Sequence, residues 1–189
     1  EWIVEHTGIR ERRIAAVGDT TASMAVAAAQ QALERAGLAA TDLDLIIVST
    51  SSPDRQLPGA APIVQSMLGA GQAPAFDLRS GCSGFIFGLS VARQYILSGS
   101  YQRILVVGSE IVSRFLNWAD RRTCVLFGDG AGAAVVEGRD TPGGVLFTAM
   151  GTQGSSYEAL TVKACGSEYP LCPLTMERHW HSIELDGQA

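Results

Sequence analysis

The sequence predicts an α/β fold, in which a largely parallel sheet is covered by helices. Two aliphatic runs, 45–48 and 104–107, have the uninterrupted hydrophobicity of strands that are covered on both faces. Apolar residues recur at helical spacing in 24–33, and the run 85–96 is apolar around most of a helix, which is typical of a buried helix. Strands that alternate with helices form right-handed crossovers, so we expect βαβ units around one core.

The boundaries of these elements follow from local signals. Thr20, Thr21 and Ser23 offer an N-cap for a first helix, and Gly37 ends it. A loop with two prolines separates the first strand from a short helix at 60–68. Strands are expected at 44–50, 75–78, 103–109, 133–136 and 144–149, and a long helix is expected at 82–98.

The first thirteen residues end in a basic cluster, 10–13, and contain one tryptophan, Trp2. One interpretation is a solvated loop with a half-buried indole. The alternative is a site for a phosphate-bearing ligand whose ring stacks on Trp2. Because charge runs usually mark solvated faces, the first interpretation is favoured.

Composition excludes several classes of function. A formal charge of −5 argues against a general nucleic-acid binder, which would carry a basic face. The four cysteines have irregular spacing and do not resemble a disulfide framework, so a cytoplasmic setting is expected. No apolar run approaches the ~20 residues of a membrane span, and neither membrane nor nucleic acid is expected as a partner. Both ends lie in sequence that looks folded, so we expect a fragment.

The strongest chemical signal is Cys82, in the segment 74–85 (PAFDLRSGCSGF). This segment reads as a strand, a tight turn of small residues, and a cysteine at the start of the long helix. N–H groups in the first turn of a helix have no intrahelical partner, and they stabilise a thiolate and an oxyanion beside it. A free cysteine is also a common buried hydrophobe, but the local context favours a nucleophile. We expect Cys82 to react before Cys124, Cys165 and Cys172.

Two further patterns suggest sites that the spacing does not support. The glycines of 128–132 (GDGAG) lack the dinucleotide-binding spacing and precede a strand, so we expect them to allow close packing of strand on helix. Cys165, Cys172, His179 and His181 match no compact zinc template, and no metal site is expected.

Several motifs in the same order resemble the β-ketoacyl-[acyl carrier protein] synthase III family. They are 1–10 (EWIVEHTGIR), 74–78 (PAFDL), 81–85 (GCSGF), 120–123 (DRRT) and 127–133 (FGDGAGA). The resemblance implies a thiolase-like fold, of which this chain is the first half of an αβαβα layered, duplicated architecture. Residues 1–150 would be the thiolase-like half with the nucleophilic cysteine. Residues 151–189 would connect to a second half that is absent from the chain.

The resemblance also implies a reaction. Cys82 would take an acyl group from acyl-coenzyme A, and the acyl-cysteine would condense with malonyl-[acyl carrier protein] to give a β-ketoacyl thioester. This acyltransferase step initiates fatty-acid or polyketide synthesis. Acyl-coenzyme A is then a substrate, and no permanently bound cofactor is expected. The histidine and asparagine that complete the family's site would lie beyond Ala189.

Five other residues receive roles from the resemblance. Trp2 and Arg121 would sandwich the adenine of coenzyme A, and His6 stands where the family often has an arginine for the phosphates. Phe127 would line the acyl pocket. Leu57 would reach across a homodimer to close the neighbouring subunit's pocket.

Two alternatives stay open. A related enzyme could pass the acyl group from Cys82 to an alcohol or amine in secondary metabolism. A truncated, non-catalytic subunit could serve only to pair with a partner.

Overall fold

The computed structural model describes residues 1–141 and 143–187, which form two compact units. Unit 1 combines Glu1–Ile14, Val112–Asp129 and the chain from Gly151 onward. Unit 2 combines Ala15–Ile111 and Gly130–Met150. The predicted division into a thiolase-like half, 1–150, and a connecting segment, 151–189, stays a prediction.

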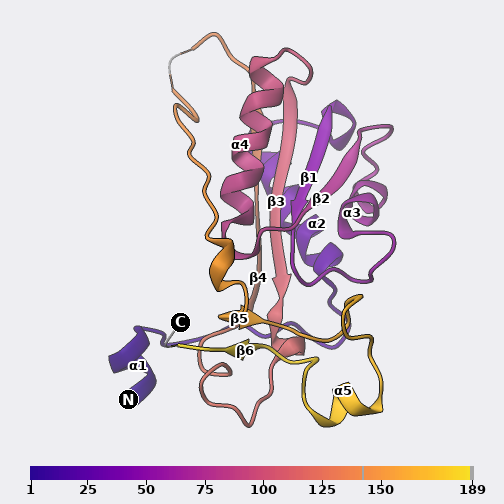
Figure 1. The fold of residues 1–189 in the computed structure, drawn as a ribbon. Coiled ribbons are helices and arrows are strands. Elements are labelled where there is room, and N and C mark those ends of the chain that lie inside the picture. The colour runs from indigo at the N-terminus through magenta and orange to yellow at the C-terminus, as the bar shows by residue number, and fades with distance from the viewer. Residues whose placement is uncertain (142, 188–189) are drawn as a thin grey trace. The chain divides into compact units, whose positions relative to one another are not determined.

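Unit 2 is built on a four-stranded sheet (Figure 1). The spatial order is β2 (Ala75–Leu78), β1 (Leu45–Ser49), β3 (Arg103–Ile111) and β4 (Asp129–Glu137). Strand β1 runs parallel to β2 and to β3. Every residue of β1 is buried, as the aliphatic run predicts. The predicted parallel sheet and its first three strands are therefore confirmed.

Three helices cover the two faces of this sheet. Helices α2 (Thr21–Ala36) and α3 (Ala60–Leu68) lie behind it in Figure 1, and α4 (Gly84–Leu97) lies in front. Ile46 of β1 belongs to the core shared with α2 and α3, whereas Ile47 belongs to the core shared with α4. Successive side chains of a strand point to opposite faces, so one buried strand supplies both cores.

The ends of α2 are those that the sequence predicts. The Thr20 side chain accepts the Ser23 N–H at 3.1 Å, and the Ser23 hydroxyl oxygen accepts the Thr20 N–H at 2.9 Å. At the other end Gly37 adopts a φ of 69°, a conformation that costs glycine little.

Strand β4 is longer than the predicted 133–136: it begins at Asp129, ends at Glu137, and contains Gly130 and Gly132 but not Gly128. The expected close packing of these glycines on a helix is wrong for Gly130 and Gly132. A Cβ atom placed on either would meet no described atom within 4 Å. Gly130 and Gly132 instead leave alternate positions near the start of β4 without side chains.

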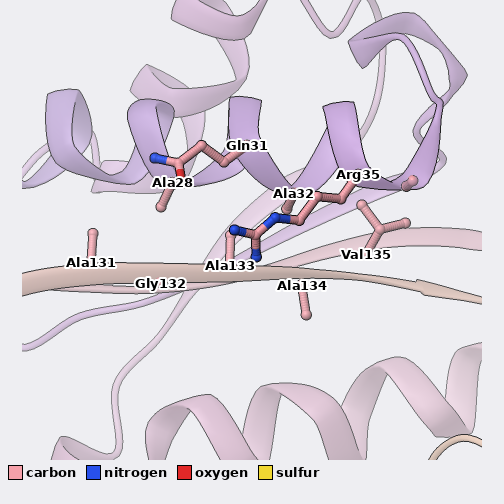
Figure 2. Close-up of a pocket in the computed structure, with 10 residues that line it drawn as sticks. Ala28, Gln31, Ala32, Arg35, Ala131, Gly132, Ala133, Ala134 and Val135 are labelled. Atoms are coloured by element: carbon pink, nitrogen blue, oxygen red, sulfur yellow. The ribbon is translucent and has the colours of Figure 1, made fainter.

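A hollow of about 460 Å3 separates β4 from α2. Figure 2 shows Gln31 and Arg35 of α2 extending toward the strand, opposite Ala131 and Ala133. Because β4 is the last strand in the sheet order, its outer edge borders this hollow without a described neighbouring strand.

The expected strand at 144–149 is wrong. Val145 and Leu146 are irregular, and their carbonyl oxygens accept hydrogen bonds from the Arg93 guanidinium at 2.9 and 3.2 Å. A side chain of α4 thus satisfies groups that a strand would offer to a neighbour.

Unit 1 contains short elements only. Residues 2–7 form a helix, α1 (Trp2–Thr7), in place of the predicted loop. Strand β5 (Leu160–Thr161) pairs antiparallel with β6 (Glu184–Leu185), and α5 (Pro173–Glu177) lies between them in sequence. The 3₁₀ turns of the chain are η1 (Ala40–Asp42), η2 (Gly81–Ser83), η3 (Val112–Phe115) and η4 (Gly154–Ser156). Within the described ranges, no helix has the length and apolarity to cross a bilayer.

Candidate active site

The candidate nucleophile, Cys82, lies in the 3₁₀ turn η2, between the end of β2 and the start of α4. Its side chain is exposed and its thiol is free. The turn is tight: Gly81 has a φ of 52°, and the Ser83 N–H donates to the Ser80 carbonyl oxygen at 3.3 Å. The predicted position of the cysteine at the start of this helix is confirmed, with one 3₁₀ turn inserted before the α-helix. The prediction that the helix is buried is wrong, because Ile86 is 54% and Leu97 is 63% exposed.

Two glycines bring α4 close to the sheet. A Cβ atom on Gly88 would lie 2.8 Å from Cγ1 of Val106, and one on Gly84 would overlap the Ser49 hydroxyl. Both glycines are buried. This close approach fixes the start of α4, and therefore Cys82, near the carboxyl end of β1. Ligands of open α/β sheets bind at that edge.

A buried polar network stabilises the same edge of unit 2. The Glu110 carboxylate accepts the Ser51 N–H at 2.7 Å and also the hydroxyl of Ser52. The Ser52 oxygen in turn accepts the Ile111 N–H at 2.9 Å. Sequence reasoning missed this network. The signal was the run of hydroxyl residues directly after the buried strand, opposite a glutamate that continues the next strand.

Leu57 lies in the loop that follows this network, and 87% of its surface is exposed. The far end of the loop is held by Asp77 of β2, whose carboxylate accepts the N–H groups of Ala60 and Ala61 at 2.8 and 2.6 Å. These bonds satisfy the first donors of α3 and anchor the far end of the loop. The network of Glu110 anchors its near end. The apolar side chain of Leu57 is thus presented outward from an anchored loop.

In unit 1 the structure brings two predicted site residues together. The rings of Trp2 and His6 stack at a centroid distance of 4.4 Å with an interplanar angle of 23°. The pair is one helical turn apart on α1, and His6 Nδ1 lies 2.9 Å from the Trp2 carbonyl oxygen. Trp2 is 53% exposed, so about half of its surface is covered, but it lies on a helix and not in the loop of the favoured interpretation.

Arg121 is exposed on the loop between η3 and β4. Its neighbour Arg122 forms a bidentate contact with Asp120, at 3.0 and 2.9 Å. Hydrogen bonds from Arg122 lower the pKa of Asp120. The local carboxylate is thus engaged by Arg122, and the Arg121 guanidinium extends from the same exposed loop.

The basic cluster 10–13 is not a uniform solvated face. Arg13 is exposed and pairs with Glu11 at 2.9 Å, whereas Arg12 is half-buried and donates to the carbonyl oxygens of Cys124 and Phe127. Phe127, the predicted acyl-pocket residue, is half-buried in unit 1. Cys82 and Leu57 belong to unit 2, whereas Trp2, His6, Arg121 and Phe127 belong to unit 1.

The other cysteines require one correction. Cys124 is buried, but Cys172 is exposed and is the N-cap of α5, so two thiols and not one precede a helix. Hydrogen bonds from the backbone N–H and the hydroxyl of Thr175 lower the pKa of Cys172. The rings of His179 and His181 lie 5.9 Å apart, and no described group of three potential metal ligands accompanies them.

Comparison with known proteins matches this arrangement to one family. The sequence model of the family described as 3-oxoacyl-[acyl-carrier-protein] synthase III matches residues 76–154, which include Cys82. A β-ketoacyl-[acyl-carrier-protein] synthase III from Caldanaerobacter subterraneus is 48% identical over 188 residues, which are 100% of this chain and 57% of the relative. The chain is therefore similar to members of this family along its whole length. It spans little more than half the length of the curated relatives that it matches.

Solved structures of the family have the same fold. The synthase III from Aquifex aeolicus matches with a TM-score of 0.86 and 41% identity, covering 99% of this chain and 56% of that one. The priming β-ketosynthase of the R1128 polyketide pathway matches with a TM-score of 0.83 and 34% identity, covering 99% and 55%. The predicted α/β thiolase-like fold is confirmed.

Proposed function

We propose that this chain carries the acyl-accepting half of a β-ketoacyl-[acyl carrier protein] synthase III. The observation that carries the proposal is the exposed Cys82 thiol in the turn that opens α4, at the carboxyl edge of the parallel sheet. Similarity to synthase III proteins along the whole chain supports it.

The first step is acyl transfer from acyl-coenzyme A. The Cys82 thiolate attacks the thioester carbonyl, a bond from Sγ to carbon forms, and the bond from carbon to the coenzyme A sulfur breaks. Coenzyme A leaves as a thiolate and takes up a proton. The Cys82 N–H stands in the first turn of a helix, where it has no intrahelical acceptor, and it stabilises the oxyanion.

The second step is condensation with malonyl-[acyl carrier protein]. Decarboxylation breaks a carbon–carbon bond and releases carbon dioxide, and the resulting carbanion attacks the acyl carbonyl on Cys82. The Cys82 thiolate leaves, and the product is a β-ketoacyl thioester on the carrier protein.

The remaining residues serve binding. Trp2 and Arg121 hold the adenine of coenzyme A, and the stacked His6 supports the indole from one side. Phe127 lines the acyl pocket. The exposed Leu57 closes the pocket of a second subunit in a homodimer. The four free cysteines fit a reducing, cytoplasmic setting. Acyl-coenzyme A is a substrate in this proposal, and the enzyme needs no permanently bound cofactor.

The test is acylation of the full-length protein by acetyl-coenzyme A, followed by intact mass measurement and peptide mapping. We expect one acetyl group on Cys82 and none on Cys82→Ala. Cys172→Ser is the matched control, because it removes another exposed thiol at a helix start and should acylate normally. Acetylation of Cys172 in place of Cys82 would overturn the proposal.

The acceptor is tested separately. Malonyl-[acyl carrier protein], an alcohol or an amine is offered to the acetylated protein, and the product is identified by mass. We expect a β-ketoacyl thioester. An ester or amide would establish the secondary-metabolic alternative, and acylation with no acceptor would favour the non-catalytic one.

A further inference from the structure

The side chain of Arg12 connects two segments of unit 1 that are far apart in the sequence. Its Nη1 donates to the carbonyl oxygen of Cys124 and, at 3.1 Å, to that of Phe127, which is 115 residues away. One guanidinium group therefore holds two carbonyl groups of the same loop. Both hydrogen bonds come from Nη1, and the rigid guanidinium fixes the direction of its N–H groups, whereas the N–H groups of a lysine ammonium rotate.

The backbone continues this contact beyond Phe127. The Asp129 N–H donates to the Arg13 carbonyl oxygen at 2.8 Å. A Cβ atom on Gly128 would lie 3.1 Å from that oxygen and 3.2 Å from Cβ of Arg12, so the two segments lie directly against each other. At this position, and not at Gly130 or Gly132, glycine allows a close approach.

The other side of the loop is held as well. The Asp129 carboxylate accepts the N–H of Ser113 at 2.8 Å and its hydroxyl at 2.6 Å. Ser113 belongs to η3 and is buried. Asp129, two residues after Phe127, is therefore fixed on one side by the 12–13 segment and on the other by η3.

We propose that Arg12 is a positioning residue that sets the place of Phe127 and thereby the acyl-chain preference of the enzyme. The inference rests on the proposed function, in which Phe127 lines the acyl pocket. Arg12 does not touch the substrate. It acts through the carbonyl group of Phe127, and loss of that hydrogen bond lets the main chain, and the ring with it, relax.

The experiment compares kcat/KM for acetyl-coenzyme A and hexanoyl-coenzyme A in the full-length protein. We expect Arg12→Lys and Arg12→Gln to change the ratio of kcat/KM for hexanoyl-coenzyme A to kcat/KM for acetyl-coenzyme A by about tenfold. This is the size of effect that one methylene group has in an apolar pocket. Gly128→Ala separates the same two segments from the other side and should change the ratio in the same direction. Arg13→Ala is the matched control, because it removes an exposed neighbouring arginine and leaves its carbonyl group in place.

The ratio distinguishes positioning from a general effect on folding. Both substrates are measured on one preparation, so loss of folded protein lowers both rates and leaves the ratio unchanged. If an Arg12 variant does not fold, Gly128→Ala decides the question. An unchanged ratio in the folded Arg12 or Gly128 variants would overturn the inference and leave the proposed function standing. A wild-type protein that forms no acyl-enzyme would overturn both.

Discussion

Trp2 allows binding to be separated from chemistry at the scale of a single residue. Its indole is exposed, and one of its faces is covered by His6. We predict that Trp2→Ala raises the KM for acetyl-coenzyme A by about three- to tenfold, because stacking on a remote ring supplies binding energy. Steady-state kinetics check this, with acetyl N-acetylcysteamine as a truncated donor that never meets the indole.

Trp118→Ala is the control for Trp2→Ala, since that indole is also 53% exposed and lies in unit 1. It should leave the KM for both donors unchanged. Equal losses with acetyl-coenzyme A and with the truncated donor would show that Trp2 supports the fold and not the nucleotide.

The thiol of Cys172 offers a test of pH dependence. Its pKa is lowered because Thr175 donates hydrogen bonds that favour the thiolate. A lowered pKa means that the reactive thiolate forms at lower pH, so alkylation by iodoacetamide should already be fast below the usual range of a cysteine. We predict that Thr175→Val moves the pH profile of Cys172 labelling upward, as followed by peptide mapping. A profile that does not move would show that the backbone N–H alone sets the pKa.

At the scale of an element, the decisive contact is that of α4 with the sheet. Alanine is favoured over glycine inside a helix by about 1 kcal/mol, but a Cβ atom on Gly88 would lie 2.8 Å from the buried Val106. Overpacking of this kind costs about 1–3 kcal/mol, so the clash should win. We predict that Gly88→Ala lowers the free energy of unfolding by up to about 2 kcal/mol in a urea titration of the full-length protein.

The control for Gly88→Ala is Gln94→Ala, at an exposed position of the same helix. Its free energy of unfolding should stay within about 0.5 kcal/mol of the wild type. A Gly88→Ala protein that is more stable than the wild type would show that α4 withdraws from the sheet at little cost.

Elements with a strong local signal could be predicted from the sequence. Helix α3 and strand β2 have the predicted ends, and α2 has its predicted caps, because periodicity and capping residues act within a few positions. Helix α1 was missed because none of its residues is buried, so it has no apolar face to recognise. The expected strand at 144–149 failed because its carbonyl groups bind Arg93, more than fifty residues earlier.

In the candidate site, too, residues with a local signal could be predicted from the sequence, and residues held by distant contacts could not. Cys82 could be predicted because the strand, the turn and the helix start are consecutive in the sequence. The role of Arg12 could not, since its acceptors are carbonyl groups more than a hundred residues away, and a carbonyl group carries no residue-specific signal. Composition made Arg12 one member of a basic cluster, and only its contacts distinguish it from Arg13.

At the scale of the whole molecule, the edge of β4 determines how the 189-residue chain behaves in isolation. After Asp129 the strand carries only glycine or alanine over residues 130–134, and it borders the hollow beside α2 (Figure 2). An exposed edge without bulky or charged side chains is a template for pairing with another strand. We predict concentration-dependent self-association of this chain, measured by light scattering.

Ala131→Lys should reduce that self-association, because an edge lysine opposes pairing between strands. Thr141→Lys is the control, as it adds the same charge at an exposed position outside the strand. Equal scattering from both variants would show that the chains associate through another surface.

The two units are built from different segments of the chain, and this affects the order in which they form during synthesis. The first 97 residues of unit 2, Ala15–Ile111, are continuous and contain three strands and three helices, so they can fold as soon as they leave the ribosome. Unit 1 is assembled from stretches at the start, the middle and the end of the chain. Trp2 and Arg12 are translated before unit 2, yet Arg12 waits for Phe127 before its hydrogen bond forms. Trp2, proposed to bind coenzyme A, is therefore made before unit 2 and ordered after it, whereas Cys82 emerges within the unit that folds first.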